Sequence, residues 1–134
     1  DALDFSGSKI KIDNAKFVNI GDKAISVGEE SIASAKNIKI NDSLVGVATK
    51  DGSQIKIDNI LLTNIKLSSV MAYRKKPIFS GAYVDINNFK ANKHPQNFIN
   101  QYNSYMVING KNINPQPIDI KSLYKSGPMM KIKF

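Results

Sequence analysis

The sequence predicts an all-β protein, a parallel β-helix of about four rungs, and three observations support this prediction. Pairs of asparagines bracket short apolar stretches four times within residues 1–92. Just before each pair, apolar and polar residues alternate, as in a strand with one buried face. These alternating segments begin at Ile10, Ile32, Ile55 and Val84, about 22 to 29 residues apart. That spacing fits one solenoid turn whose strands pair with their counterparts in the next turn.

Each repeat contains three short strand-like segments. The last interval is longer because residues 77–81 extend a turn. Four rungs at the strand spacing of about 4.8 Å form a stack about 20 Å tall. The first strand of each repeat covers residues 2–6, 24–28, 47–50 and 71–74, the second covers 10–12, 32–34, 55–57 and 84–86, and the third lies between the asparagines.

Other strand-rich architectures fit the pattern less well. A repeat of about 22 residues is too short for a four-stranded propeller blade. A leucine-rich horseshoe requires leucines at fixed offsets, and a sandwich would not repeat at this interval. No segment keeps a 3.6-residue apolar period over ten residues, so we expect no long helix.

Alternation assigns the side chains of the first two strands to the two faces of the sheet. The predicted inward residues are Leu3, Phe5, Ile25, Val27, Val47, Thr49 and Tyr73 on the first strand, and Ile10, Ile12, Ile32, Ile55, Ile57, Val84 and Ile86 on the second. The predicted outward columns of the first strand are Asp4, Ser26, Ala48 and Ala72, then Ser6, Gly28, Lys50 and Arg74. Because most of these outward side chains are small, we expect a shallow groove along the first strand.

Asparagine tolerates a left-handed backbone and hydrogen-bonds neighbouring backbone groups, and stacked asparagines can bond from rung to rung. We therefore expect turn ladders rather than ligand contacts at the bracketing positions. These are Asn14, Asn19, Asn37, Asn41, Asn59, Asn64, Asn88 and Asn92.

The repeats end near Asn92, so residues 1–92 are the predicted rungs and residues 93–134 a capping segment of the same domain. His94 and Pro95 indicate a loop that leaves the coil. Residues 105–113 predict a hairpin, since Asn109-Gly110 suits a type I′ turn. Residues 118–124 are expected to form a single helical turn. Such a cap would hide the last rung from water and from other chains.

The charge balance limits the partners. Lys and Arg total 19 against 11 Asp and Glu, a net charge of +8, which favours anionic partners. Arg74 is the only arginine, so specific nucleic-acid readout is not expected. Without Cys, disulfides, thiolate zinc sites and cysteine nucleophiles are excluded. With His94 as the only histidine, we expect no metal and no cofactor, and no apolar run is long enough for a membrane span.

The first strand begins within one or two residues of Asp1, and no cap or signal sequence precedes it. An uncapped rung would leave backbone groups unpaired along its edge. We therefore expect a piece of a longer chain, with upstream β-helix rungs, or another chain, covering the N-terminal edge.

The rung phrases at residues 1–8, 21–29, 48–53 and 72–77 resemble the C-terminal rungs of bacterial right-handed parallel β-helix repeat proteins of the pectin-lyase-like superfamily. This resemblance covers residues 1 to about 92. It implies a right-handed coil and a secreted, periplasmic or cell-surface location. It does not select one activity, because the superfamily includes polysaccharide lyases, hydrolases, epimerases and adhesins.

The candidate ligand-binding residues surround the predicted groove of the first strand. Asp4, Lys50 and Arg74 belong to its outward columns, and Glu29, Asp51, Lys75 and Lys76 follow the strand directly. If the domain has a ligand, we expect an anionic polysaccharide held mainly by Lys50, Arg74, Lys75 and Lys76. Tyr73, Tyr83, Tyr102 and Tyr105 could stack on sugar rings, although an inward Tyr73 would be buried.

Three functional classes follow: a carbohydrate-interaction module, a uronate-modifying enzyme, and a structural end-piece of a longer coil. Lys50 or Arg74 could act as the base of a lyase or epimerase. Hydrolytic members of the superfamily use clusters of aspartates, whereas this groove offers only Asp4. The simplest interpretation is that the charged residues at the turns form ion pairs between neighbouring rungs; these residues are Asp22, Lys23, Glu29, Lys50 and Asp51. We therefore expect a non-catalytic domain of a bacterial surface or exported protein that interacts with anionic polysaccharide; the alternative is a uronate lyase or epimerase fragment.

Overall fold

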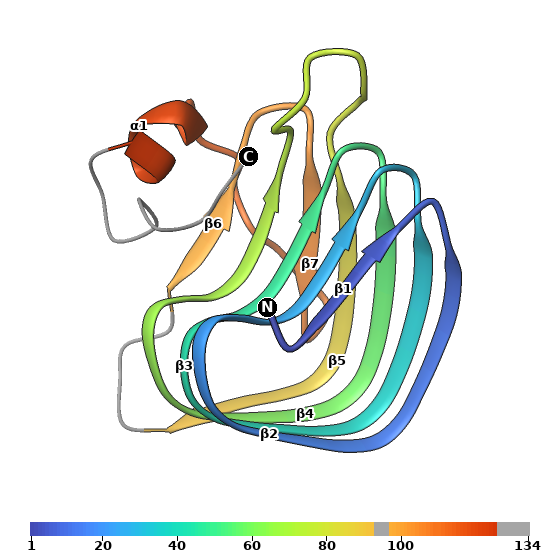
Figure 1. The fold of residues 1–134 in the computed structure, drawn as a ribbon, viewed down its shortest axis with the longest axis vertical. Coiled ribbons are helices and arrows are strands. Elements are labelled where there is room, and N and C mark those ends of the chain that lie inside the picture. Colours follow the sequence, from blue (N-terminus) through green and yellow to red (C-terminus); the bar gives the residue numbers. More distant parts are fainter. Residues whose placement is uncertain (93–96, 126–134) are drawn as a thin grey trace.

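The computed structural model describes residues 1–92 and 97–125 and is an all-β parallel solenoid of about four turns. The long strands of successive turns are hydrogen-bonded to one another in parallel, which confirms the predicted fold class (Figure 1). The second and third segments of one repeat and the first segment of the next join into one long, bent strand, instead of three separate short ones. The stacked strands are β1 (Leu3–Ser6), β2 (Lys9–Gly28), β3 (Ile32–Lys50), β4 (Gln54–Tyr73) and β5 (Tyr83–Asn92).

Asparagines bend these strands at the corners of each rung. Their backbone is left-handed, with φ of 57° at Asn14 and Asn37 and 69° at Asn59. The side-chain Nδ2 of Asn37 donates to Asn14 Oδ1 at 3.0 Å, and that of Asn59 donates to Asn37 Oδ1 at 2.8 Å. This asparagine ladder confirms the predicted turn ladders at these positions. Asn19, Asn64 and Asn88 are also left-handed.

Two of the predicted ladder positions are wrong. Asp42, with φ of 59°, occupies the left-handed corner that we assigned to Asn41, and Asn64 Nδ2 donates to its carboxylate. Asn41 and Asn92 instead lie within strands, where both pair with Thr63. Aspartate can take this corner because its short acceptor side chain tolerates the same left-handed backbone.

The core consists of apolar columns that run through the rungs. On the first strand, Ile25 pairs with Leu3 on one side and with Val47 on the other, as predicted. On the second strand, Ile55 and Val84 are fully buried neighbours. Burying an aliphatic side chain of this size contributes about 2 kcal/mol, so these columns supply much of the folding free energy.

The inward position predicted for Ile32 is wrong. Ile32 is 50% exposed, and the neighbouring Ala33 and Ala35 fill the core instead. Alternation allows either register in this segment, because Ile32 and Ser34 share one face and the two alanines share the other. The paired rungs select the second register, since Ala33 lies between Ile10 and Ile55.

The first strand of the fourth rung is also shifted by one residue from the prediction. Ala72 points into the core, whereas Met71 and Tyr73 point outward. Tyr73, and not Arg74, therefore stands beside Lys50. The pairing of β3 with β4 shifts by one residue just before this segment, and such a shift exchanges the two faces of a strand.

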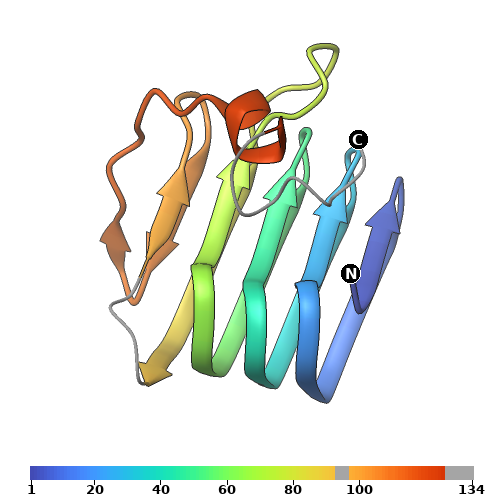
Figure 2. The same ribbon diagram turned by 60° about the vertical axis from the view of Figure 1, so that its left-hand side comes forward.

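The C-terminal segment continues and covers the coil. β6 (Phe98–Asn100) pairs with β4, an addition that the sequence did not predict, and β7 (Tyr105–Ile108) pairs with β5 (Figure 2). β8 (Lys111–Asn112) returns antiparallel to β7 through Asn109-Gly110, where both φ angles are positive, so the predicted hairpin is confirmed. The predicted helical turn is α1 (Ile120–Lys125). The loop predicted at His94 and Pro95 lies outside the described residues.

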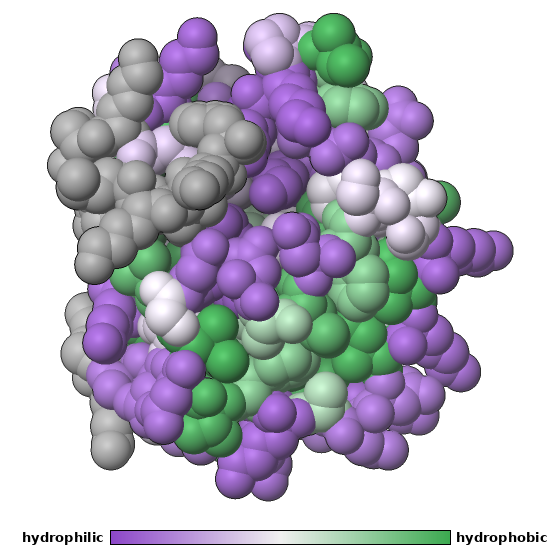
Figure 3. All heavy atoms as spheres, viewed as in Figure 1, coloured by the Kyte–Doolittle hydropathy of each residue, from purple (hydrophilic) through white to green (hydrophobic). Residues whose placement is uncertain are grey.

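The other end of the coil has no such covering among the described residues. β1 pairs on one side only, with β2. Figure 3 shows apolar surface at the centre of this end, framed by hydrophilic side chains. Leu3, Phe5, Ile10 and Ile20 are only partly buried there. The expectation that further rungs or another chain cover this edge stays a prediction. Within residues 1–92 and 97–125, no helix is long and apolar enough to cross a bilayer.

Candidate ligand-binding site

A pocket of about 220 Å³ lies where the first-strand segments of the four rungs end. We call it the charged pocket. Six of the seven sequence-predicted site residues line it, and Arg74 does not. Its full lining is Asp1, Asp4, Phe5, Ser6, Lys23, Gly28, Glu29, Lys50, Asp51, Lys75 and Lys76.

The turn after β3 positions the centre of this pocket. Asp51 and Gly52 both adopt left-handed backbone, with φ of 56° and 75°, and reverse the chain after Lys50. The Lys50 side chain then lies across Gly28: a Cβ on Gly28 would meet Lys50 Cε at 3.0 Å. The absence of a side chain at Gly28 thus leaves room for the aliphatic stem of Lys50.

Asp51 organises the loop that follows β4. Its side chain is fully buried, and Oδ1 accepts hydrogen bonds from the backbone N–H groups of Lys75 and Lys76, each 2.8 Å long. Oδ2 has no hydrogen-bond partner among the described residues. Because charge-assisted bonds to a buried carboxylate are strong, Asp51 fixes the two lysines at the pocket wall.

Ion pairs compensate several of the other charges of the pocket. Lys23, which the sequence assigned to an ion pair at a turn and not to the binding site, is fully buried, with Nζ 3.1 Å from Asp22 Oδ1 and 3.6 Å from Asp1 Oδ1. Lys76 Nζ lies 3.0 Å from Glu29 Oε1, and this hydrogen bond lowers the pKa of Glu29. The lining holds four lysines and four acidic side chains, so the charged pocket has no net excess of either sign.

Two lysines of the charged pocket have a lowered pKa. Burial, and secondarily repulsion from Lys50, Lys23 and Lys76, lowers the pKa of Lys75 to about 8. Burial also lowers the pKa of Lys50, with a further contribution from Lys23. A lysine with a lowered pKa is partly neutral at alkaline pH and can then accept a proton.

Helix α1 covers the outward face beside this pocket, so the predicted open groove is wrong. Tyr73 is fully buried, and its hydroxyl lies 2.6 Å from that of Tyr124 on α1. Ala48 and Met71 belong to the same buried apolar cluster as Ile120 and Tyr124. The small outward residues therefore make room for the C-terminal segment and do not leave a channel for a polymer.

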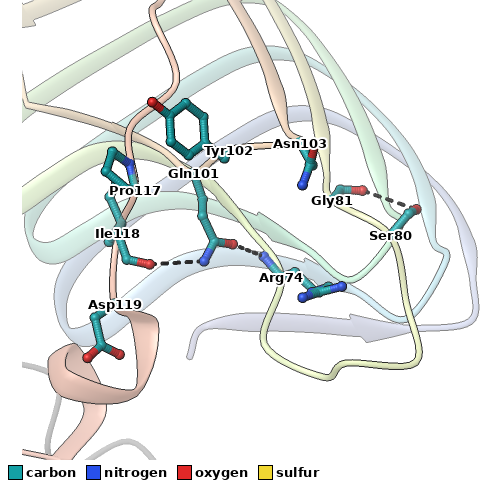
Figure 4. Close-up of a pocket in the computed structure, with 9 residues that line it drawn as sticks. All are labelled: Arg74, Ser80, Gly81, Gln101, Tyr102, Asn103, Pro117, Ile118 and Asp119. Atoms are coloured by element: carbon teal, nitrogen blue, oxygen red, sulfur yellow. Dashed lines mark hydrogen bonds between the residues drawn. The ribbon is translucent and has the colours of Figure 1, made fainter.

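Arg74 lies outside the charged pocket, beside a larger one of about 630 Å³ (Figure 4). Its backbone N–H donates to Gln101 Oε1 at 2.8 Å, and Gln101 Nε2 donates to the Ile118 carbonyl at 3.0 Å. Asp119, on the same wall, caps α1, because its Oδ1 accepts a hydrogen bond from the backbone N–H of Ser122 at 3.2 Å. Its Oδ2 accepts a second bond from Ser122 Oγ at 2.7 Å, and these bonds lower the pKa of Asp119. The residues that line the pocket are Arg74, Ser80, Gly81, Gln101, Tyr102, Asn103, Pro117, Ile118 and Asp119.

The remaining tyrosines are exposed. Tyr83 and Tyr105 stand side by side on β5 and β7, with ring centroids 6.5 Å apart and planes tilted by 44°. Tyr102 is 56% exposed at the rim of the Arg74 pocket. These three rings are accessible to a sugar, whereas Tyr73 is buried and is not. Tyr73 was predicted to be buried in the core, but it is buried on the outer face of the strand.

No group of three His, Cys, Asp or Glu side chains within residues 1–92 and 97–125 is placed to hold a metal ion. The charged pocket offers ion pairs, a buried carboxylate and two lysines of lowered pKa.

Comparison of the chain with protein families, with curated proteins and with solved structures finds no match.

Proposed function

We propose that this domain is a non-catalytic module of a bacterial surface or exported protein and that it binds anionic polysaccharide. The observation that carries the proposal is the excess of exposed cations over exposed acidic residues. Among the described residues, the exposed cations are Lys9, Lys11, Lys16, Lys36, Lys39, Lys56, Lys66, Arg74, Lys76, Lys90, Lys111 and Lys121, whereas the exposed acidic residues are Asp1, Asp4, Asp13, Glu30, Asp58 and Asp119.

Several features support a polysaccharide over other anions. A rigid stack of strands presents these charges on flat faces suited to an extended polymer, and the surface carries exposed tyrosines. Sequence-specific nucleic-acid readout relies on arginine, and the chain has only Arg74. The resemblance of the rung phrases to the pectin-lyase-like superfamily supports a bacterial, exported carbohydrate-binding context.

Retention on immobilised polygalacturonate, compared with a neutral polysaccharide such as dextran, tests the proposal. We expect retention on the acidic matrix alone, with elution as salt increases, because exposed charges are screened within about 8 Å at physiological ionic strength. Equal retention on both matrices, or none on polygalacturonate at low salt, would contradict the proposal.

The second candidate is a uronate lyase or epimerase, and the lowered pKa of Lys75 favours it. A neutral Lys75 could remove the proton beside a uronate carboxylate while Lys50 and Lys76 balance the charge. Incubation with polygalacturonate and alginate at alkaline pH distinguishes the two candidates. Unsaturated products that absorb in the ultraviolet, or inverted uronates detected by NMR, would establish the enzyme; unchanged polymer supports the binding module.

A further inference from the structure

A groove of about 510 Å³ crosses all four rungs on the outer face of the third segments. One wall is the asparagine ladder of Asn14, Asn37 and Asn59, and the other is a row of side chains two residues further along each rung. We call it the lysine groove. Its lining is Asn14, Ala15, Lys16, Asn37, Ile38, Lys39, Asn59, Leu61 and Lys90.

The row that forms the second wall follows from the repeat. In three rungs a corner asparagine is followed two positions later by a lysine, namely Lys16, Lys39 and Lys90, and in the remaining rung by Leu61. The strand register places Lys16 beside Lys39, Lys39 beside Leu61, and Leu61 beside Lys90. The row therefore runs parallel to the solenoid axis, with about 4.8 Å between neighbouring rungs.

The charge of this groove is not balanced. It contains three exposed lysines and no acidic residue, and no ion pair among the described residues involves any of the three. Like charges on directly neighbouring strands destabilise a sheet. The charged pocket holds as many acids as lysines, and so does the groove lined by Lys11, Lys36 and Lys56 beside Asp13, Asp58 and Asp85. The lysine groove thus contains a row of lysines whose charges no acidic residue of the groove balances and which does not stabilise the fold.

We propose that the lysine groove is the binding site for acidic polysaccharide and that the polymer lies across the rungs, parallel to the solenoid axis. This inference rests on the proposed function and assigns it to a surface other than the one around Lys50 and Arg74. The lysines bind carboxylate or sulfate groups of the polymer, and the asparagine ladder binds its hydroxyl groups.

The ladder has hydrogen-bonding capacity left for this role. Asn37 and Asn59 each use one of two amide hydrogens in the bonds to the preceding rung. The other amide hydrogen and the second lone pair of each carbonyl remain, and all three asparagines are exposed. Left-handed backbone holds these side chains in a fixed row, so binding requires little ordering.

The same lining disfavours two other polyanions. The groove contains no aromatic ring and no arginine, which are the groups that stack on nucleic-acid bases. A lipid surface would need inserted apolar side chains, whereas the groove offers Leu61 flanked by lysines and amides. Hydroxyl and carboxylate groups on one extended chain match the lining better than either alternative.

A matched pair of triple variants tests the site. Lys16→Ala with Lys39→Ala and Lys90→Ala removes the positive row, and Lys9→Ala with Lys11→Ala and Lys56→Ala removes the same charge from another exposed face. We expect the groove variant to lose affinity for polygalacturonate about tenfold or more, and the control to lose only a few-fold through net charge. Circular dichroism and thermal unfolding of both variants confirm that each is folded.

A gain-of-function variant tests the site without relying on loss. Leu61→Lys completes the row between Lys39 and Lys90, and Ile32→Lys adds the same charge at an exposed position on another face. We expect Leu61→Lys to bind polygalacturonate several-fold more tightly than the wild type, and more tightly than Ile32→Lys.

The outcomes separate the site from the function. If the wild type does not bind polygalacturonate, the proposed function is wrong. If it binds, but the two triple variants weaken equally and Leu61→Lys matches Ile32→Lys, only net charge matters and the site assignment is wrong. Loss of binding to single-stranded DNA or to anionic vesicles in the groove variant, with polygalacturonate binding retained, would assign the groove to that other partner.

Discussion

The charged pocket and the lysine groove lie on the same rungs but use their lysines differently. In the charged pocket, Lys23 is fully buried, and Lys50 and Lys75 are partly buried, among carboxylates that balance them. In the lysine groove, Lys16 and Lys39 are exposed and face no acidic residue. A buried charge must be paired, because leaving water costs several kcal/mol, whereas an exposed charge has no such requirement. The lysines of the charged pocket therefore serve mainly to stabilise the fold, whereas those of the lysine groove are available to a ligand.

The largest expected effect separates the two regions by stability. Asp51→Ala removes a buried carboxylate that holds two backbone N–H groups, and it leaves Lys50 and Lys75 without its charge. We expect the free energy of unfolding, measured by urea denaturation, to fall by about 3 kcal/mol. Asp58→Ala is the control, since its exposed carboxylate accepts one bond from Asn88 and should contribute less than about 1 kcal/mol. Similar losses in both variants would show that Asp51 has no special structural role.

A smaller effect is expected where α1 covers the outward face beside the charged pocket. Tyr73→Phe removes the buried hydroxyl pair with Tyr124 and should lower the free energy of unfolding by about 1 kcal/mol. Tyr102→Phe, at an exposed ring, should change it little. Combining Tyr73→Phe with Tyr124→Phe should cost less than the sum of the single changes, since both remove the same bond. Fully additive losses would contradict the hydroxyl contact.

The charged pocket should also contribute a gradual pH dependence to the stability of the fold, through Lys75. Lys75 has a folded-state pKa of about 8, below the value of 10.5 expected when unfolded, so the unfolded chain holds more protons between these values. The unfolding free energy should therefore gain a rising contribution from Lys75 between about pH 8 and pH 10. Lys75→Met should reduce this rise in denaturation curves recorded across that range. An identical pH profile in the variant would show that burial of Lys75 does not disfavour its charge.

The solenoid was predictable from the sequence because large apolar residues and asparagines recur at the same positions of each repeat. Ile10, Ile55 and Val84 mark the inward columns, and the corner asparagines mark the turns. The predicted register is wrong where the side chains of the core are small. Alanines at positions 33 and 72 fill narrow parts of the interior, while the larger neighbours Ile32 and Tyr73 point outward. Alternation alone does not distinguish these faces, and only pairing with neighbouring rungs does.

The candidate site was predictable only in part. Six predicted residues meet in one pocket because each lies on a first-strand segment or directly after one, and parallel stacking aligns such positions. The cover of the face beside that pocket includes a contact between Tyr73 and Tyr124, which are 51 residues apart, and local sequence pattern does not reveal it. Lys23 was expected only in an ion pair at a turn. Its burial in the pocket was not predicted, because the strand pairing shifts between Ile20 and Lys23 and simple alternation does not apply there. The lysine groove had a visible signal, the recurrence of lysine two residues after the corner asparagine.

NMR mapping of the surface that contacts polygalacturonate is the most direct test of the difference between the two regions. Side-chain resonances of the lysines are followed as the polymer is added at low salt. Our account predicts the largest changes at Lys16, Lys39 and Lys90, together with the amide groups of the asparagine ladder. Changes confined to Lys50, Lys75 and Lys76 would place the polymer in the charged pocket and contradict the account.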